Sequence, residues 1–584
     1  MRIREARPDE AQVLSGLALR SKAHWGYDDS FLAACADELT LSATDVTARR
    51  VIVAQDEESG ELLGVASLEG EPPDGTLGLL FVEPHAIGRG IGRTLYAHVL
   101  DAARDLGFER LTIDSDPHAV DFYRALGARP VLGGPLPRLR VDVLPREEWV
   151  RAWTGGRRTV QLGNVAEFQA QFGALSGTAR LASGHYSCLA ALGSPHPAVI
   201  VLPRTVPPGW IELLSRQLAW GAVELYDGLA PGPATAPAGT AAGLTAELLA
   251  RPVLTAHLRG LGLPFVPWGH SAASGELSGR PLPPGALRYE SKRAANALFL
   301  RLAPAHRDDI TVPAQRPAAD RRAAARLVLA RARCGEASIL KSEHGVGGSG
   351  TYVVRSVRDL PRALRALPRG PLLVEDYLTG ARAPHDLTYD GIVDATGAVY
   401  DVGVAVMDVR GTAYRGATVG PGVVPDRSAA IALRFGRAVG RELAASGYRG
   451  WYDVDFVTAP TGGLGHVLAP TEINLRLTGP SVAFMVKARL DETRGGGHLV
   501  RTLDHIPLAA RLPDAELIVW LRELTDRCTA LGAVLLPSIP TAAFDPAPFV
   551  GVLLAARTAD RLDAAEALVR GAGRDLGGIF RSAR

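Results

Sequence analysis

The spacing of hydrophobic residues predicts alternating strands and helices along most of the chain. In the first 145 residues, period-two apolar runs predict strands and a 3.6-residue period predicts helices. The expected strands are 51–54, 63–68, 77–82, 110–113 and 139–143, and the expected helices are 91–106 and 119–126. The pattern restarts at Thr159, with a buried strand at 198–202 and a helix at 210–218. This alternation predicts α/β and α+β domains.

Three segments lack such a pattern. Residues 146–158 end in the basic sequence Trp-Thr-Gly-Gly-Arg-Arg and are expected to form a linker. Residues 229–242 and 271–287 are rich in Pro, Gly, Ala and Ser, a composition typical of surface loops.

The length, charge and cysteine content of the chain exclude several classes of protein. A chain of 584 residues is expected to form three or four structural units. Its net charge of +2 provides no field for binding nucleic acid or an anionic membrane. The four cysteines form no CxxC pair, and no apolar run approaches the ~18 residues of a membrane span. We therefore expect a cytoplasmic protein with reduced cysteines.

A glycine-rich turn connects the strand ending at Val82 to the helix at 91–106. It contains Gly88, Arg89, Gly90, Gly92 and Arg93. Glycines at a strand-to-helix turn let backbone N–H groups approach a pyrophosphate, and the helix N-terminus favours its negative charge. A tight structural turn is the alternative interpretation.

Together with the segment 114–127, which contains Tyr123, this turn resembles the GNAT acetyltransferases over residues 1–145. The resemblance implies that acetyl-CoA binds at the turn and that Tyr123 protonates the leaving thiolate; the alternative is that Tyr123 is a core aromatic residue. The cofactor-binding residues would be Val82, Gly88, Arg89, Gly90, Gly92 and Arg93. Ile87 and Asp116 depart from the family, which usually has Gln or Arg and Asn there. Glu69 and His85 are candidate general bases by strand position alone, or else surface charges.

The sequence 451–476 predicts two strands joined by a glycine-rich hairpin at 461–465. Alternation places Glu472, Asn474 and Arg476 on one face, where Asp455 of the preceding strand can join them. Two carboxylates and an amide oxygen suit Mg²⁺ bridging nucleotide phosphates, and Arg476 then faces the anionic centre. The alternative is a solvent-exposed polar face.

Upstream, a predicted strand ends at Lys341 and continues into a loop containing Gly347, Gly348 and Gly350. The loop is not a P-loop, because no Gly-Lys-Ser/Thr opens a helix. It suits a hairpin lid that covers phosphates while Lys341 neutralises them. Lys292 lies in the first turn of a predicted helix, where a phosphate partner would offset the unfavourable helix dipole, unless the position is simply solvated.

The order of these segments, with Leu-Leu-Val-Glu-Asp-Tyr-Leu at 372–378, resembles the ATP-grasp superfamily over about 160–540. The resemblance implies phosphate contacts for the two lysines and the lid, and an acyl-phosphate steadied by Arg476. The implied nucleotide site is Lys292, Lys341, Gly347, Gly348, Gly350, Glu375, Tyr377, Leu378 and Asp386, and the implied Mg²⁺ ligands are Asp455, Glu472 and Asn474. The segment 159–287 looks like the pre-ATP-grasp domain of peptide-ligase-like proteins.

The expected domains are 1–145 (GNAT), 146–158 (linker), 159–287 (pre-ATP-grasp), 288–540 (ATP-grasp) and 541–584 (an extension packing on the ligase). Together they predict an enzyme that uses ATP and Mg²⁺ to join a carboxylate to an amine, and acetyl-CoA to acetylate an amine. Its substrates would be small amino-acid-like metabolites in a biosynthetic or detoxifying pathway. A homodimer is possible, as in both families. Two alternatives stay open: a non-catalytic acetyl-CoA-sensing domain that regulates the ligase, and an ATP-grasp small-molecule kinase.

Overall fold

The computed structural model describes residues 1–131, 137–143, 147–229, 243–345, 350–367, 369–378, 386–460 and 466–581. The chain forms two compact units. Unit 1 comprises 1–147, 209–224 and 488–498, and unit 2 comprises 148–208, 225–487 and 499–584. The expected mixture of α/β and α+β domains is confirmed, whereas the five domain boundaries remain a prediction. No helix among the described residues is long and apolar enough to cross a membrane.

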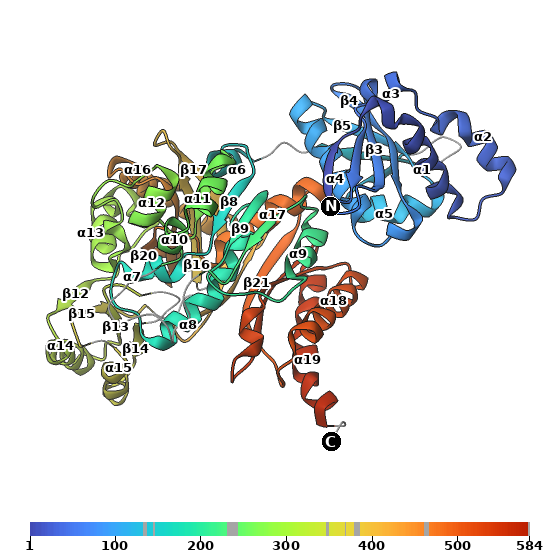
Figure 1. Ribbon diagram of the computed structural model, residues 1–584. Coiled ribbons are helices and arrows are strands. Elements are labelled where there is room, and N and C mark those ends of the chain that lie inside the picture. The colour runs from blue at the N-terminus through green and yellow to red at the C-terminus, as the bar shows by residue number, and fades with distance from the viewer. Residues whose placement is uncertain are drawn as a thin grey trace. The chain divides into compact units, whose positions relative to one another are not determined.

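Unit 1 is built on a seven-stranded sheet of order β1-β2-β3-β4-β5-β7-β6 (Figure 1). Its elements are β1 (Arg2–Glu5), α1 (Ala11–Ala23), α2 (Asp29–Leu39), α3 (Ala43–Ala48), β2 (Ile52–Gln55), β3 (Leu62–Glu71), β4 (Asp74–Val82), α4 (Ile91–Leu106), β5 (Arg110–Asp114), α5 (Val120–Ala125), β6 (Arg129–Val131), β7 (Arg138–Asp142) and α9 (Trp210–Leu218). Neighbouring strands are antiparallel except β4 and β5, which pair in parallel. Helix α4 packs its apolar side on β3 and β4, with Leu95 and Tyr96 fully buried.

Unit 2 begins with a four-stranded sheet of order β10-β9-β8-β11, whose inner strands β8 and β9 are parallel. The elements of this part are α6 (Glu148–Thr154), β8 (Thr159–Leu162), α7 (Val165–Ala170), α8 (Gly177–Tyr186), β9 (Pro197–Val201), β10 (Glu224–Tyr226), α10 (Leu244–Leu249), α11 (Pro252–Gly260), β11 (Phe265–Pro267) and α12 (Ala272–Ser278).

A second four-stranded sheet, of order β12-β15-β13-β14, is packed against two helices (Figure 1). Its elements are β12 (Gln315–Ala318), α14 (Arg321–Arg333), β13 (Ser338–Ser342), β14 (Thr351–Val354), α15 (Leu360–Ala366) and β15 (Leu372–Asp376). Helix α13 (Lys292–Leu302) precedes it and packs on β20.

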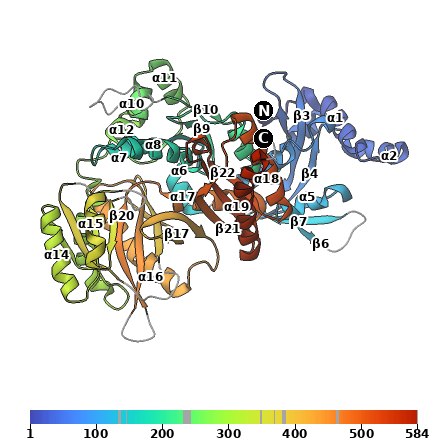
Figure 2. The ribbon, with the colours of Figure 1, turned by 90° about the horizontal axis from the view of Figure 1, so that it is seen from below.

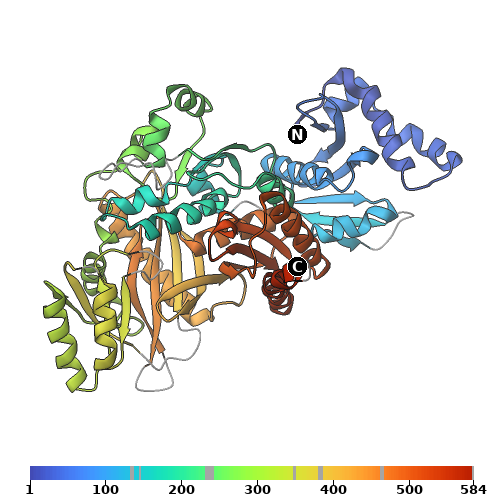
Figure 3. The same cartoon turned by 60° about the horizontal axis from the view of Figure 1, so that its bottom comes forward.

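The third sheet of unit 2 has eight strands in the order β20-β19-β16-β17-β18-β21-β23-β22. Its elements are β16 (Asp386–Val393), β17 (Val399–Arg410), β18 (Ala413–Val419), α16 (Asp426–Ala445), β19 (Gly450–Pro460), β20 (His466–Asn474), α17 (Gly479–Arg494), β21 (Leu499–Pro507), α18 (Asp514–Ala530), β22 (Val534–Ile539), β23 (Phe549–Ala556) and α19 (Ala559–Arg581). Helix α16 packs on β16 and β17 (Figure 2), and α18 and α19 pack on β21–β23 (Figure 3).

Two segments differ from the sequence expectation. The segment expected to be a linker contains α6, because Trp149 and Val150 are apolar enough to be buried in unit 2. The segment 271–287, expected to be loop, contains α12, which Ser271 and Ser274 stabilise with a capping box. The prediction of loop weighted its Pro and Gly content and overlooked this cap.

Candidate functional site

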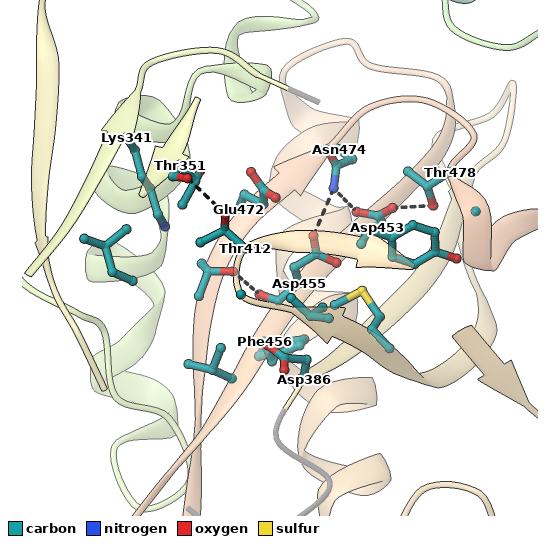
Figure 4. A pocket seen from close by; sticks show the side chains of 18 of the residues that line it. Lys341, Thr351, Asp386, Thr412, Asp453, Asp455, Phe456, Glu472, Asn474 and Thr478 are labelled. Carbon is teal, nitrogen blue, oxygen red and sulfur yellow. Dashed lines mark hydrogen bonds between the residues drawn. The ribbon is translucent and has the colours of Figure 1, made fainter. Parts of the chain in front are cut away.

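A cavity of about 760 Å³ in unit 2 is lined by residues from the last two sheets and from α8 (Figure 4). Most of the residues that the sequence marks for nucleotide and metal binding line this one cavity. They are Lys341, Glu375, Tyr377, Leu378, Asp386, Asp455, Glu472, Asn474 and Arg476. The fold thus gathers residues that lie up to about 135 positions apart in the sequence (476 minus 341).

The acidic wall of the cavity comes from the antiparallel pair β19 and β20. Their register places Asp455 opposite Glu472 and Asp453 opposite Asn474. The Asn474 Nδ2 donates to Asp453 Oδ1 at 2.6 Å and to Asp455 Oδ2 at 3.3 Å (Figure 4). A solvent-exposed polar face is excluded for Asn474, which is 7% exposed.

The acid groups of this wall perturb one another. Burial raises the pKa of Asp455 well above its ordinary value, and the neighbouring Asp453 and Glu472 add to the shift. Burial also opposes ionisation of Glu472, but the charges of Lys292 and Lys341 outweigh it and lower its pKa to about 2. One carboxylate is therefore held ionised beside another that resists ionisation, which is an arrangement that a divalent cation would relieve.

The donor set fits Mg²⁺. No group of three or more His, Cys, Asp or Glu side chains able to hold a metal occurs in the part of the chain that the structure describes. Mg²⁺ does not require one, since it is commonly held by one or two carboxylates together with substrate phosphates and water. Asp455 and Glu472 supply two carboxylates, and rotation of the Asn474 amide would supply an oxygen.

Lys292, at the start of α13, reaches the acidic wall. Its Nζ lies 2.7 Å from Glu472 Oε2, and the residue is 6% exposed. The solvated helix start considered from the sequence is thus excluded. The Ser291 side chain caps the helix and also donates to Glu343 Oε1 at 2.6 Å, which fixes the first turn.

Lys341 projects from β13 into the same cavity. Its Nζ lies 2.7 Å from Glu375 Oε1, and Gln315 Nε2 donates to the other Glu375 oxygen at 3.0 Å. Glu375 therefore holds the lysine in the structure, besides lying on the strand expected to border adenine. Further along, the Tyr377 hydroxyl accepts from Arg355 at 3.0 Å.

The loop after β13 is closed by Gly350. The Ser342 N–H donates to the Gly350 carbonyl at 2.7 Å, and Gly350 has φ +77°. A Cβ there would lie 2.1 Å from Ser342 Oγ, so only glycine fits. Gly347 and Gly348, which the sequence assigns to the lid, lie outside the described residues.

Arg476 lines the cavity just beyond β20 and is held by a residue that sequence reasoning missed. Its Nη1 donates to both Glu290 oxygens, at 2.9 and 2.8 Å, and its guanidinium lies 5.7 Å from the Phe168 ring centroid. Glu290 also accepts from the Leu475 N–H. Because Glu290 is 186 positions away, no local pattern indicated it.

Asp453 was also missed, although it alternates with Asp455 on the same strand face. It accepts from Thr478 Oγ1 at 2.8 Å as well as from Asn474. Burial raises its pKa well above the ordinary value, and Asp390 on the neighbouring strand adds to the shift. The period-two signal that selected Asp455 would have selected Asp453 as well.

In unit 1, the glycine-rich turn at residues 88–92 has the backbone conformation expected of a pyrophosphate-binding loop, which we call the cradle. Gly88 and Gly90 have φ values of +82° and +85°, and Gly90 is the N-cap of α4. Arg89 is exposed, and a Cβ at Gly92 would contact Val82 Cγ2 at 3.6 Å. The N-terminus of α4, a 16-residue helix, is therefore not covered by side chains of the turn's glycines. Its free N–H groups could bind an anion.

Arg93 has a different orientation. Its Nη1 donates to the Arg216 carbonyl of α9 at 2.9 Å, and burial together with the charge of Arg216 lowers its pKa. A Cβ at Gly90 would lie 2.9 Å from Arg216 Cγ. Arg216 thus adjoins the cradle, which no signal within residues 1–145 could have indicated.

Tyr123 is buried at 6% exposure among Tyr96 and Phe122. Burial raises its pKa, and the nearby Asp116 adds to the shift, so the phenol keeps its proton. The Asp116 carboxylate accepts from the Tyr27 hydroxyl at 2.9 Å. Both interpretations of Tyr123, as acid and as core residue, are compatible with this position.

The two candidate bases have different surroundings. Glu69 is paired with Arg49 at 2.7 Å and accepts from Ser67 Oγ at 2.6 Å. The His85 side chain is 54% exposed and lies 3.5 Å from Glu61. Ile87, which replaces the family's usual polar residue, is 38% exposed.

Comparison with known proteins finds a family match for the N-terminal part of the chain. Residues 19–128 match the model of the acetyltransferase (GNAT) family, the family that the sequence resembles there. No curated protein is significantly similar to the sequence.

Several solved structures are similar to parts of the chain. N5-carboxyaminoimidazole synthase of Aspergillus clavatus, with ADP and 5-aminoimidazole ribonucleotide, is 17% identical, with 66% of this chain and 100% of that chain covered and a TM-score of 0.41. Biotin carboxylase of Campylobacter jejuni is 14% identical over 70% and 89%, with a TM-score of 0.40. The PaiA N-acetyltransferase of Thermoplasma acidophilum, with coenzyme A, is 14% identical over 24% and 97%, with a TM-score of 0.22.

Proposed function

We propose that unit 2 is an ATP-grasp ligase that activates a carboxylate as an acyl-phosphate and joins it to an amine. The observation that supports this most directly is the cavity that Lys341 and Arg476 line together with Asp455 and Glu472, while Lys292 lies 2.7 Å from Glu472. Two cations and two carboxylates that line one cavity, with a third cation paired to one of these carboxylates, suit a polyphosphate and its metal. Asn474, which is neutral, would supply its amide oxygen as the third ligand of the metal.

In the proposed reaction, an oxygen of the substrate carboxylate attacks the γ-phosphorus of ATP, and ADP leaves. Lys341 and Lys292 move from their ion pairs to the phosphates and offset the charge that builds up on them. Asp455, Glu472 and Asn474 would hold Mg²⁺, which would supply positive charge to the phosphates. Arg476, fixed by Glu290, stabilises the anionic carbonyl oxygen when the amine attacks and phosphate leaves.

For the GNAT domain we propose acetyl transfer from acetyl-CoA to an amine. The turn at Gly88, Arg89 and Gly90 would bind the pyrophosphate, together with the first N–H groups of α4. Tyr123, protonated because its pKa is raised, would donate to the departing thiolate. The substrates of both units would be small amino-acid-like molecules.

The decisive experiment incubates the full-length protein with ATP, Mg²⁺ and pooled carboxylates, with either hydroxylamine or pooled amines. Hydroxylamine traps an acyl-phosphate as a hydroxamate. We expect ADP, free phosphate, a hydroxamate, and an amide whose mass equals two substrates minus water. A phosphorylated alcohol that accumulates without hydroxamate would identify a kinase instead.

Release of CoA thiol from acetyl-CoA, measured with a panel of amines, tests the second activity. If Gly90→Arg abolishes thiol release, the result supports binding of acetyl-CoA at the glycine-rich turn. Binding of acetyl-CoA without turnover on any amine would favour the sensor alternative.

A further inference from the structure

A carboxyl group in the same cavity takes no part in the reaction described so far. Asp504 lies on β21 and lines the cavity, yet it is only 8% exposed. Neither of its oxygens has a hydrogen-bond partner within normal distance and angle limits among the described residues, although the Tyr186 phenol is near enough to interact with it. A buried carboxyl group that is poorly satisfied in this way is uncommon in folded proteins and calls for an explanation, such as a catalytic role.

The local backbone directs Asp504 toward the cavity. The register of β21 against β23 shifts between Leu503 and Ile506, which marks a β-bulge or a similar irregularity. Bulges commonly occur beside active sites, where they turn a side chain out of its regular alternation. The position of Asp504 is therefore a feature of the strand and does not follow from a flexible loop.

Two tyrosines lie near Asp504, and among the described residues no cation is recorded as acting on its carboxyl group. The phenol of Tyr186, from α8, and that of Tyr414, from β18, are close enough to Asp504 that its charge raises their pKa values, after burial as the larger cause. Burial raises the pKa of Asp504 to about 7, and its interaction with Tyr186 opposes this shift. The Tyr186 ring lies 5.5 Å from that of Trp268. Aromatic rings around a carboxylate are a common environment for an ammonium ion.

Tyr186 also connects this corner to the proposed reaction centre. Besides Asp504, both Arg476 and Asp453 act on the Tyr186 phenol electrostatically. Arg476 is the group proposed to face the carbonyl that is attacked. An amine held at Asp504 would therefore lie in the same cavity as the activated carboxylate, on the side of Tyr186 and Tyr414.

We propose that Asp504 binds the acceptor substrate as an ammonium ion and takes the proton that makes its nitrogen nucleophilic. This inference rests on the proposed ligase function and names the class of its second substrate, a cationic primary or secondary amine. The ammonium ion passes one proton to Asp504, and its freed lone pair forms the C–N bond. The C–O bond to phosphate then breaks, phosphate leaves with a second proton from nitrogen, and Asp504 returns its proton to water on product release.

The test compares two acceptors in full-length wild type and Asp504→Asn. Hydroxylamine is largely uncharged at pH 7.5 and needs no base, so its hydroxamate reports acyl-phosphate formation alone. We expect Asp504→Asn to keep hydroxamate formation within about twofold while amide formation with cationic amines falls about 100-fold or more. Asp526→Asn, the same change on an exposed position of α18, is the matched control. Unchanged amide formation, or an equal loss of both products, would overturn the inference.

A binding measurement decides the inference even where no carboxylate substrate reacts. Saturation-transfer NMR with a mixture of ethylammonium, ethanolamine and amino-acid amides should show signals for wild type and for Asp526→Asn, and none for Asp504→Asn. Uncharged alcohols of equal size should give no signal. Absence of hydroxamate with every carboxylate would contradict the proposed ligase, whereas amines that bind Asp504→Asn as well as wild type, or do not bind wild type, would contradict the assignment of Asp504.

Discussion

At the scale of single residues, the main feature of the site in unit 2 is that each of its three cationic side chains forms an ion pair with a carboxylate. Lys292 pairs with Glu472, Lys341 pairs with Glu375, and Arg476 pairs with Glu290. The attraction between the two charges of each pair offsets part of the desolvation free energy of the buried cation. In the proposed function, Lys292 and Lys341 exchange a carboxylate for a phosphate when nucleotide binds, so each ion pair keeps a positive charge in place for the substrate.

Lys341→Met tests that exchange. Loss of one charge-assisted contact of about 1.5–3 kcal/mol should raise the KM for ATP about 10- to 100-fold. Steady-state kinetics of ADP release across ATP concentrations measures it. Since the change leaves Glu375 without its cation, the double variant Lys341→Met/Glu375→Gln serves as the stability control and should show the same high KM. An unchanged KM in both would exclude a phosphate role for Lys341.

Asp504 should give the protein a specific pH dependence of stability. Its pKa is raised by burial from 3.8 to about 7 in the folded protein, so the folded state binds more protons than the unfolded state between these values. Stability from this group is therefore present below about pH 4 and lost as pH rises through about 7, by on the order of 4 kcal/mol.

Calorimetry of Asp504→Asn checks the sign. The midpoint of thermal unfolding should exceed that of wild type at pH 8, and the difference should vanish near pH 4. Tyr186 and Tyr414, the titratable groups that face Asp504, stay protonated throughout this range because their pKa values are raised. A difference that is constant with pH would mean that Asp504 titrates normally.

At the scale of elements, the site depends on how strands are joined and aligned. The register of β19 and β20 sets Asp455 against Glu472, and a slip by one residue would turn these side chains to the opposite face. The link between β13 and β14 depends on Gly350, whose carbonyl accepts from Ser342. Hairpin geometry thus positions the lysine relative to the acids.

Gly350→Ala tests the role of that hairpin. A Cβ would meet Ser342 Oγ at 2.1 Å in a backbone conformation with φ +77°, so the hairpin must shift. We expect kcat/KM for ATP to fall about tenfold or more, a loss of about 1.4 kcal/mol or more in transition-state stabilisation. Gly370→Ala, where an added Cβ meets nothing within 4 Å, is the matched control. Equal activity of the two variants would exclude a role for the loop.

At the scale of the whole molecule, the chain carries two candidate sites, one in each compact unit. The glycine turn and Tyr123 belong to unit 1, and the cavity belongs to unit 2. Unit 1 also includes two short segments, 209–224 and 488–498, from the C-terminal two-thirds of the sequence. Arg216, beside the cradle, comes from the first of them. A cut at residue 145 would consequently remove part of unit 1.

The two activities should be separable by point substitution. Tyr123→Phe is expected to slow acetyl transfer about 100-fold while ADP release stays within twofold of wild type. Glu472→Gln should abolish ADP release, because it removes a metal ligand and a partner of Lys292, and should leave acetyl transfer unchanged. Measuring both activities on both variants checks this, and an effect that crosses from one unit to the other would show regulation of one activity by the other.

The sequence alone determined the mixed α/β class, most strands and helices of residues 45–145, and a minority of the residues that line the cavity, including Lys341, Glu472 and Asn474. It did so because those signals are local: period-two alternation assigned Glu472 and Asn474 to one face, and glycines marked the turns. It did not indicate α6 or α12, where buried tryptophan and a serine cap overrode the loop-like composition.

Only the tertiary structure decided which distant groups meet. Glu290 holds Arg476, Arg216 adjoins Gly90, and Asp504 lies near Tyr186 although 318 positions separate them (504 minus 186). Local patterns carry no information on such pairs, because each is created by the packing of one sheet or helix against another. The raised pKa of Asp504 has the same origin, since burial exists only once the chain has folded.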